Sequence, residues 1–430
     1  MLTAMHSGAG KTVLACALMA AYKKRGLDVC ACKCGPDYID PMFHRRVLGI
    51  PSRNLDLFLQ GEAGVKRSLA RAKGDLTILE AAMGYYDGLA GTDHASAYDL
   101  ARRTDTSALL VLRPRGSGLS LAAQVRGMMT FREDSHLVGL LLTDCKPSLA
   151  AYLRPILERE CGLPVLGALP PMEEARLDSR HLGLLTANEV ENFSERFAAI
   201  AEQVEKSADL DAILNLAVEN AEESKEVLRP SPRCTIAVAR DEAFCFCYED
   251  SLEALRSAGA ELRFFSPLRD AAFPEDAEGL YLCGGYPELY ARQLSENTAM
   301  RRSIGAAVAA GLPTVAECGG FLYLQETLED EAGCAFPQCG VLPGRGYRTD
   351  SLQRFGYLWL EAPKDSLLFR SGERVPAHEF HYWDSTDNGE DIGCVKPGGR
   401  TWRGGWAGET LYAGFPHLHL DGELPLAARF

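Results

Sequence analysis

Short apolar runs alternate with segments of helical spacing along the first half of the chain. Helical spacing is visible at Ser68–Ala72 and at Leu119–Met129. The apolar runs between such segments are DVCACKC, DLTILEAAM, ALLVLR and LVGLLLTD. Continuous apolar strands that alternate with helices are typical of a parallel sheet covered by helices on both faces. The pattern therefore predicts an α/β fold for this half.

The pattern changes near residue 190 and again near residue 234. The stretch between these points is polar and helix-forming, and it ends in two prolines within RPSPR. A second α/β pattern begins at CTIAVARDEAF and continues through AELRFFSP, GLYLCGGYPE and LPTVAECGGFLYL. We therefore expect two α/β domains, residues 1–190 and 234–430, joined by a helical linker over residues 191–233.

The composition favours a globular protein without a nucleic-acid or membrane partner. The chain has 430 residues, of which 47% are hydrophobic and 24% charged, and its net charge is −14. No long Lys/Arg block is present to neutralise the phosphates of a nucleic acid. No apolar run approaches the roughly 20 residues that span a bilayer. We therefore expect a cytoplasmic protein.

The 14 cysteines are too dilute in a chain of this length for a disulfide framework, so we expect reduced thiols. Three of them alternate in CACKC, at Cys30, Cys32 and Cys34. On a strand these three side chains would share one face. Zinc and iron–sulfur sites use other spacings and more ligands, which favours small apolar strand residues over a metal site here.

The first chemical motif, SGAGKT, precedes a helix-like run and looks like a phosphate-binding loop. Gly8 and Gly10 would let backbone N–H groups point at the anion, and the following helix would add its positive N-terminal end. Lys11 would neutralise the outer phosphates, and the hydroxyl of Thr12 would ligate magnesium. The strict pattern has a glycine where Met5 stands. The motif still predicts a site for a nucleotide with Mg²⁺.

Several carboxylates lie in loops that follow predicted strands. Asp37 and Asp40 bracket Tyr38 in KCGPDYIDPMFH, whereas Glu80 ends the apolar strand of TILEAAMGYYDG and Asp87 lies in its glycine loop. Carboxylates at strand ends beside a phosphate loop are where magnesium and a second substrate should bind. The alternative is that the aspartates cap helices. Their clustering in two Gly/Pro loops favours a site.

A second chemical motif, AECGGFLYL, places Cys318 on a turn between an apolar strand and a helix. Such a turn exposes a nucleophile, and the N–H of Gly319 could approach a developing oxyanion. Another glycine turn, with Gly285, could complete the oxyanion hole, and His417 or His419 could serve as the base. The alternative is a buried core thiol. The turn context favours the nucleophile.

In combination, these parts resemble glutamine amidotransferases that join an ATP-dependent synthetase half to a thiol glutaminase half. More narrowly, the chain is similar over nearly its whole length to the cobyrinic acid a,c-diamide synthase family. The pair GPDYIDP and HEFHY is specific, because the related cobyric acid synthases lack it. The matching motifs, in order, are GAGKT, KCGPDYIDPMFH, PSRNLD, DSRHLGLL, GLYLCGGYPELYA, AECGGFLYL, GYRTD and HEFHY.

The resemblance implies an N-terminal P-loop NTPase-like parallel sheet, similar to dethiobiotin synthetase, and a C-terminal class I glutamine amidotransferase-like α/β domain. It further implies ATP- and glutamine-dependent amidation of the a and c acetates of cobyrinic acid in cobalamin synthesis. Hydrogenobyrinic acid or nickel sirohydrochlorin are alternative substrates. A tetrapyrrole-binding homologue with impaired ATP turnover is a further alternative. Amidation order and assembly, for example as a homodimer, stay open.

The same resemblance implies roles for individual residues. Cys318 would attack the amide of L-glutamine with His417 as base, and Gly285 and Gly319 would bind the oxyanion. Gly8, Gly10, Lys11 and Thr12 would hold ATP. The implied magnesium ligands are Thr12, Asp37 and Glu80. The implied catalytic residues of the synthetase half are Asp37, Tyr38, Asp40 and Asp87.

The chain departs from the family pattern at a few positions. The family loop begins with a glycine, and Arg113 and Thr143 stand where an aspartate and an asparagine are usual. These changes bear on nucleotide affinity and base recognition. Many thiol glutaminases carry a glutamate two residues after the base, but here that residue is His419, which favours a Cys–His dyad. Only Met1–Ala4 precede the loop, so we expect the natural start to lie upstream.

Overall fold

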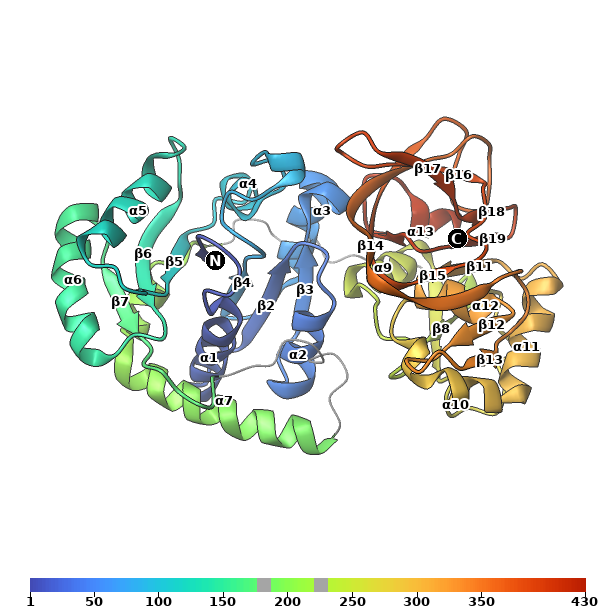
Figure 1. Ribbon diagram of the computed structural model, residues 1–430, viewed down its shortest axis with the longest axis horizontal. Coiled ribbons are helices and arrows are strands. Elements are labelled where there is room, and N and C mark those ends of the chain that lie inside the picture. Colours follow the sequence, from blue (N-terminus) through green and yellow to red (C-terminus); the bar gives the residue numbers. More distant parts are fainter. Residues whose placement is uncertain (176–186, 220–230) are drawn as a thin grey trace. The chain divides into compact units, whose positions relative to one another are not determined.

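The computed structural model describes residues 1–175, 187–219 and 231–430 (Figure 1). By internal contacts the chain divides into two compact units. The first comprises Met1–Leu57 and Gly61–Lys225, and the second comprises Phe58–Gln60 and Glu226–Phe430. The motif DSRHLGLL, which contributed to the family resemblance, lies outside the described residues.

The first unit is built on one parallel sheet of seven strands in the order β3-β2-β4-β1-β5-β6-β7. The four predicted strands of this half form β2, β4, β5 and β6. The bounds are β1 (Leu2–Ala4), β2 (Val29–Cys34), β3 (Ser52–Leu55), β4 (Leu76–Glu80), β5 (Ala108–Leu112), β6 (Leu137–Leu142) and β7 (Val165–Ala168).

Helices cover both faces of this sheet, as the apolar pattern predicts. Leu109 and Val111 pack with α1, α2 and α7, whereas Leu110 and Leu112 pack with α4, α5 and α6, because alternate strand residues face opposite sides. The bounds are α1 (Lys11–Lys24), α2 (Ile39–Val47), α3 (Leu57–Arg71), α4 (Ala97–Arg103), α5 (Leu119–Thr130), α6 (Pro147–Cys161), α7 (Ala187–Ser207) and α8 (Leu210–Asn215).

Helix α7 runs beside α1 in the first unit (Figure 1). Phe197 of α7 is fully buried and meets Phe43 of α2 edge to face, with ring centroids 5.4 Å apart. The hydroxyl of Tyr22 in α1 donates to the carbonyl of Leu210 at 2.8 Å. The polar stretch that the sequence assigns to a linker therefore contributes an amphipathic helix whose apolar side closes this core.

Strand β1 lies at the centre of the sheet although it has three residues. It pairs with β4 and β5, with Leu2 opposite both Glu80 and Leu109. The terminal ammonium of Met1 donates to the carbonyl of Ser107 at 2.7 Å, and burial lowers its pKa to about 6. The strand that a phosphate loop requires is therefore present.

The alternating cysteines of β2 lie in the core. Cys32 and Cys34 share one face and pack with Leu55, Val65 and Leu79, under α3. All 14 cysteines are free thiols. No helix among the described residues is long and apolar enough to cross a membrane.

The second unit contains a six-stranded sheet in the order β18-β19-β11-β10-β8-β9, which is parallel except for β18. Its strands are β8 (Cys234–Ala239), β9 (Ala260–Phe265), β10 (Gly279–Leu282), β11 (Thr314–Glu317), β18 (Trp406–Ala407) and β19 (Leu411–Gly414). Its helices are α9 (Glu249–Ala258), α10 (Ala291–Glu296), α11 (Thr298–Ala309), α12 (Gly319–Leu324) and α13 (Leu426–Arg429).

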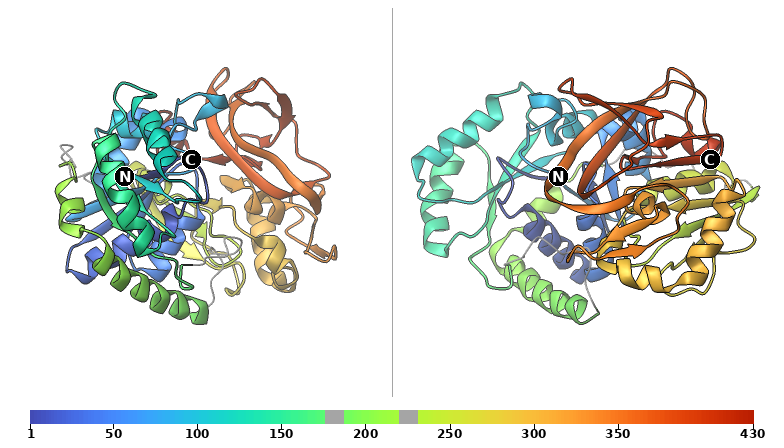
Figure 2. Two further views of the ribbon diagram at one scale, coloured as in Figure 1. Left: turned by 60° about the vertical axis from the view of Figure 1, so that its left-hand side comes forward. Right: turned by 45° about the vertical axis from the view of Figure 1, so that its right-hand side comes forward.

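A second sheet in this unit has the order β13-β12-β14-β15-β20, with β16 on β14 and β17 on β16. Strands β14 and β15 form a long, curved ribbon (Figure 2). All four tryptophans of the chain lie in the second unit. The bounds are β12 (Thr327–Glu329), β13 (Ala335–Pro337), β14 (Arg345–Glu361), β15 (Arg374–Ser385), β16 (Ile392–Val395), β17 (Thr401–Gly404) and β20 (His417–Leu418).

The packing of α7 predicts a large effect of Phe197→Ala. Removing this buried ring should lower the free energy of unfolding of the first unit by about 3–5 kcal/mol. The matched control is Glu202→Ala on the same helix. Glu202 makes an exposed ion pair with Lys24 at 3.2 Å, and its loss should change stability by less than about 1 kcal/mol. Urea unfolding, monitored by hydrogen exchange of the α1 amides, measures the change in stability of both variants. Equal effects would contradict the assignment of α7 to this core.

Candidate active sites

The phosphate loop connects β1 to α1 and has the backbone that its glycines permit. Gly8 and Gly10 have φ values of 77° and 90°, in the left-handed region that favours glycine. Met5, which replaces the usual first glycine, does not have a positive φ and packs partly buried against the core on the α4–α6 side. The loop therefore tolerates methionine at this position, and α1 still begins at Lys11.

Lys11 folds back over its own loop. Its ammonium donates to the carbonyls of His6 at 3.2 Å and Met83 at 2.6 Å. Burial, followed by the nearby charge of Lys33, lowers the pKa of Lys11 to about 8, against the opposing effect of Glu80. A bound phosphate would replace these two carbonyls as the hydrogen-bond partner of the amine.

Thr12, Glu80 and Asp40 meet around a buried lysine at the carboxyl ends of β2 and β4. The hydroxyl of Thr12 donates to Glu80 Oε1 at 2.5 Å, and Lys33 Nζ lies 2.8 Å from the same oxygen. Lys33 Nζ also lies 2.5 Å from Asp40 Oδ2. The structure therefore brings three of the predicted site residues into one cluster.

The charged groups in this cluster shift one another's pKa values. Burial raises the pKa of Asp40 well above its usual range, and Glu80 adds to this effect. Burial alone would also raise the pKa of Glu80, but Lys33 and His44 hold it well below its usual range. Burial disfavours the ammonium of Lys33, yet the surrounding carboxylates raise its pKa well above the usual value.

Asp37 and Asp87 shape the neighbouring loops. Asp37 Oδ1 accepts from the N–H groups of Ile39 at 2.8 Å and Asp40 at 3.1 Å, so it caps α2 as the alternative interpretation proposes. Asp87 Oδ2 accepts from Gly84 N–H at 2.9 Å and holds the glycine turn. Both aspartates are thus fixed close to the cluster. Tyr38, which follows Asp37 in the sequence, is buried.

The sequence patterns did not indicate four residues of this site, which are Lys33, His44, Ser52 and Asn54. Lys33 is the ion-pair partner described above. His44 Nε2 lies 3.5 Å from Glu80 Oε2, and its Nδ1 is 3.0 Å from the hydroxyl of Ser52. Asn54 donates to the carbonyl of Asp37 at 2.6 Å. The available signal was a lone lysine in an otherwise apolar strand, because such a charge needs a buried partner.

The cluster fits magnesium bound together with a nucleotide. Among the described residues, no group of three or more His, Cys, Asp or Glu side chains could hold a metal by itself. Magnesium at nucleotide sites uses only one or two carboxylates, with phosphate and water oxygens completing its shell. The contact between Thr12 and Glu80 places a hydroxyl and a carboxylate, both hard oxygen donors, at the start of α1.

A cavity of about 310 Å³ adjoins the loop, with Gly10, Arg113 and Thr143 in its wall. The hydroxyl of Thr143 donates to the carbonyl of Ala9 at 2.8 Å and so braces the loop. The guanidinium of Arg113 pairs with Asp144, with Nε 2.8 Å from Oδ2. Both departures from the family pattern therefore have structural roles. A larger cavity of about 550 Å³ lies at the opposite, amino ends of the strands.

In the second unit, the predicted strand-to-helix turn is present at Cys318. This residue joins β11 to α12 with φ 48° and ψ −102°, a strained conformation for a non-glycine residue. A Cβ on Gly320 would lie 2.1 Å from the carbonyl oxygen of Leu282, so the backbone approach requires glycine. Strain of this kind is found where a turn presents a nucleophile.

The surroundings of Cys318 contain the other predicted glutaminase residues. A Cβ on Gly319 would lie 3.1 Å from the backbone nitrogen of Gly285, so these two glycine turns meet. A Cβ on Gly284 would lie 2.4 Å from His417 Cε1, which places the imidazole against the same turn. Burial, and then the carboxylate of Glu288, raise the pKa of the Cys318 thiol well above its usual range. The thiol therefore needs a base.

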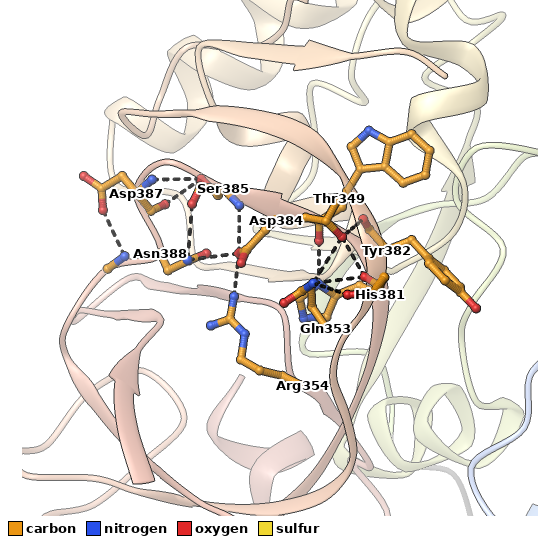
Figure 3. Close-up of polar contacts among 12 residues, drawn as sticks. Thr349, Gln353, Arg354, His381, Tyr382, Asp384, Ser385, Asp387 and Asn388 are labelled. Atoms are coloured by element: carbon orange, nitrogen blue, oxygen red, sulfur yellow. Dashed lines mark hydrogen bonds and ion pairs between the residues drawn. The ribbon is translucent and has the colours of Figure 1, made fainter. Parts of the chain in front are cut away.

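The segments GYRTD and HEFHY lie on β14 and β15 and are tied by a polar network (Figure 3). Thr349 donates to the carbonyl of Tyr382 at 2.7 Å. The Arg354 guanidinium pairs with Asp384 at 2.5 Å, and Asn388 donates to the same carboxylate oxygen at 3.1 Å. The ring of Tyr382 points away from this network (Figure 3). The pairing of β14 with β15 is shifted here, so the network fixes an irregular stretch of sheet.

Comparisons with known proteins agree with this architecture. Residues 1–185 match the CobQ/CobB/MinD/ParA nucleotide binding domain, and residues 235–424 match the CobB/CobQ-like glutamine amidotransferase domain. The cobyrinate a,c-diamide synthase of Clostridium tetani is 38% identical over 382 residues, which cover 88% of this chain and 86% of that protein.

Two further relatives cover almost the whole chain. The cobyrinate a,c-diamide synthase of Caldanaerobacter subterraneus subsp. tengcongensis is 36% identical over 428 residues, 98% of this chain and 94% of that protein. The Salmonella typhimurium protein of the same name is 36% identical over 434 residues, 97% of this chain and 94% of that protein. The chain therefore belongs to the cobyrinate a,c-diamide synthase family, which confirms the resemblance and both predicted fold types.

The environment of Lys11 predicts that ATP affinity falls as the pH rises above about 8. In the free protein the pKa of Lys11 is lowered to about 8, and phosphate oxygens should raise it on binding. The protonated form is then favoured in the complex, so binding is strongest below this pH and weakens by up to about tenfold per unit above it. Calorimetry of Mg-ATP binding between pH 7 and 9.5 tests this. A constant affinity over that range would contradict it, and Lys11→Met should bind weakly throughout.

Proposed function

We propose that the chain converts cobyrinic acid into its a,c-diamide, with ATP as the energy source and the amide of L-glutamine as the nitrogen source. It is a ligase of cobalamin synthesis. The observation that carries the proposal is the presence, in one chain of this family, of a phosphate loop with a buried carboxylate cluster and a strained thiol turn next to a histidine. Each half supplies one part of an amidation.

In the second unit, the thiol of Cys318 transfers its proton to His417 and attacks the side-chain carbonyl carbon of glutamine. The N–H groups of Gly285 and Gly319 stabilise the oxyanion that forms. His417 returns the proton to the leaving nitrogen, ammonia departs, and a thioester remains on Cys318. Water then hydrolyses the thioester, which releases glutamate and restores the thiol.

In the first unit, the loop and the start of α1 hold the phosphates of ATP, with Lys11 as the cation. A substrate carboxylate attacks the γ-phosphorus, ADP leaves, and an acyl phosphate forms. Ammonia then attacks the acyl carbon, and inorganic phosphate leaves as the amide forms. Magnesium held by Thr12, Glu80 and Asp37 would neutralise charge on the phosphates.

Asp40 and Asp87 complete the synthetase site in this proposal. Their charges raise the pKa of Lys11, which supports a place for both near its ammonium. We assign them, with Asp37 and Tyr38, to orienting the substrate carboxylate and the incoming ammonia. The cavity of about 310 Å³ beside Gly10 is suited to the nucleoside of ATP.

Incubation with cobyrinic acid, ATP, Mg²⁺ and glutamine, followed by mass spectrometry of the product, tests the proposal. A diamide with release of ADP is expected. Parallel reactions with hydrogenobyrinic acid and nickel sirohydrochlorin identify the preferred macrocycle. Macrocycle binding without ADP release would show a homologue that has lost ATP turnover. Light scattering tests whether the active species is a homodimer.

Replacing Cys318 with serine should separate the two nitrogen sources. Glutamine-dependent amidation should fall by roughly 10³-fold or more, because the nucleophile is lost. Amidation with ammonium chloride should be largely retained, because the synthetase site keeps all its residues. Initial rates with each nitrogen source measure the difference. Glutamine-dependent activity at the normal rate would remove Cys318 from the mechanism.

Replacing Glu80 with glutamine should impair amidation with either nitrogen source, because the magnesium and Thr12 partner loses its charge. Hydrolysis of glutamine by the second unit should persist and also reports that the protein is folded. Glu202→Gln, which alters an exposed glutamate of the same unit, is the control and should behave as the native protein. An unchanged ammonia-dependent rate in Glu80→Gln would exclude Glu80 from the site.

A further inference from the structure

Glu317 is a buried acid directly before the nucleophile. It is the last residue of β11 and only 1% exposed, and the residues before it, Val315 and Ala316, belong to the apolar core. A carboxylate in such a place is unfavourable unless it is hydrogen-bonded or paired. The partners of Glu317 therefore indicate what the acid does there.

Those partners are on β20 and β10. Glu317 Oε1 accepts from the backbone N–H of Leu418 at 3.0 Å. Glu317 Oε2 accepts from the hydroxyl of Tyr281 at 3.1 Å and lies 3.8 Å from His417 Nδ1. One carboxylate thus accepts from the backbone next to His417 and lies beside one edge of its imidazole.

We propose that Glu317 is the positioning residue of the glutaminase, acting through His417. This inference rests on the proposed roles of Cys318 and His417. With Nδ1 turned toward the carboxylate, the imidazole is held in the tautomer that leaves Nε2 to accept the thiol proton. The carboxylate also stabilises the imidazolium that this transfer creates. The proton moves only from the Cys318 thiol to Nε2 and then to the departing ammonia.

The proposal explains how a glutaminase works without an acid two residues after its base. His419 occupies that position and packs against Tyr248, with ring centroids 4.8 Å apart. The distance of 3.8 Å between Glu317 and His417 is longer than a hydrogen bond, and such contacts commonly shorten when substrate binds. The acid thus comes from the strand that carries the nucleophile.

Other titratable groups near His417 do not provide this charge. His378 is its register partner on β15, and burial lowers the pKa of His378 to about 3. Burial likewise lowers the pKa of His381 to about 4. Both are therefore neutral near pH 7. Of the described acids that raise the pKa of Cys318, namely Glu288, Glu379 and Glu317, Glu317 lies within ion-pair distance of the His417 ring.

Glu317→Gln in the full-length protein tests the role. We expect the glutamine-dependent kcat to fall by roughly 10²- to 10⁴-fold with KM for glutamine little changed. The acidic limb of the kcat/KM profile should move to lower pH, because an imidazole without its carboxylate is easier to deprotonate. Ammonia-dependent amidation should be retained. Glu296→Gln, which alters an exposed acid of the same unit, is the control.

Glu317→Asp keeps the charge and should retain more activity than Glu317→Gln. If the glutamine variant fails to fold, the aspartate variant carries the test through a lowered kcat at constant KM. An unchanged rate and an unchanged pH limb in a folded Glu317→Gln protein would overturn the proposal. A uniform loss of glutamine- and ammonia-dependent activity would also overturn it, because that result indicates a structural role.

Alkylation of Cys318 by iodoacetamide, followed by peptide mass spectrometry, measures the reactivity of the thiol. This readout does not depend on the proposed ligase function. Glu317→Gln should slow this alkylation near pH 7, since less thiolate forms beside a poorer base. If the native chain does not use glutamine but the alkylation rates still differ, the ligase proposal fails and the role of Glu317 stands. Equal alkylation rates in the native and variant proteins would overturn the role of Glu317.

Discussion

Lys33 is buried at the carboxyl end of β2, and its ammonium joins segments that are distant in the chain. Glu80 ends β4, Asp40 lies in the first turn of α2, and Thr12 lies in the first turn of α1. Each reaches this one charge directly or through Glu80. Removing one partner of such a group leaves an unpaired buried charge, which costs about 3–5 kcal/mol. The same cluster therefore fixes the ends of two strands and two helices and sets the positions of the groups that would handle phosphate.

The second unit meets a different constraint, which is close backbone approach. Cys318 is held with a positive φ, and the glycines around it leave no room for a side chain. A surrounding sheet must hold such a turn in place, because the conformation is unfavourable by itself. β11 on one side and α12 on the other provide this support. In both units, the reactive groups are thus placed at the carboxyl ends of parallel strands, where the topology leaves an opening.

Much of this arrangement could be predicted from the sequence because it depends on local patterns. The apolar runs of β2, β4, β5 and β6, the phosphate loop and the cysteine turn each have a periodicity or motif of their own. Lys33 and Glu317 could not be assigned in this way, since their partners come from segments far along the chain. The ribbon of β14 and β15 was also missed, because its pairing is shifted and its segments GYRTD and HEFHY carry no clean alternation. Asp37 caps α2 in the structure, and its role as a magnesium ligand stays a prediction.

The placement of the tryptophans has an optical consequence. All four lie in the second unit, at Trp359, Trp383, Trp402 and Trp406, and the first unit has no tryptophan. Tryptophan fluorescence, excited where tyrosine does not absorb, therefore reports on the glutaminase half alone. A titration with nucleotide would leave this signal unchanged unless the synthetase half transmits a change to its neighbour. The native chain thus contains a built-in spectroscopic reporter for communication between its two halves, without any label.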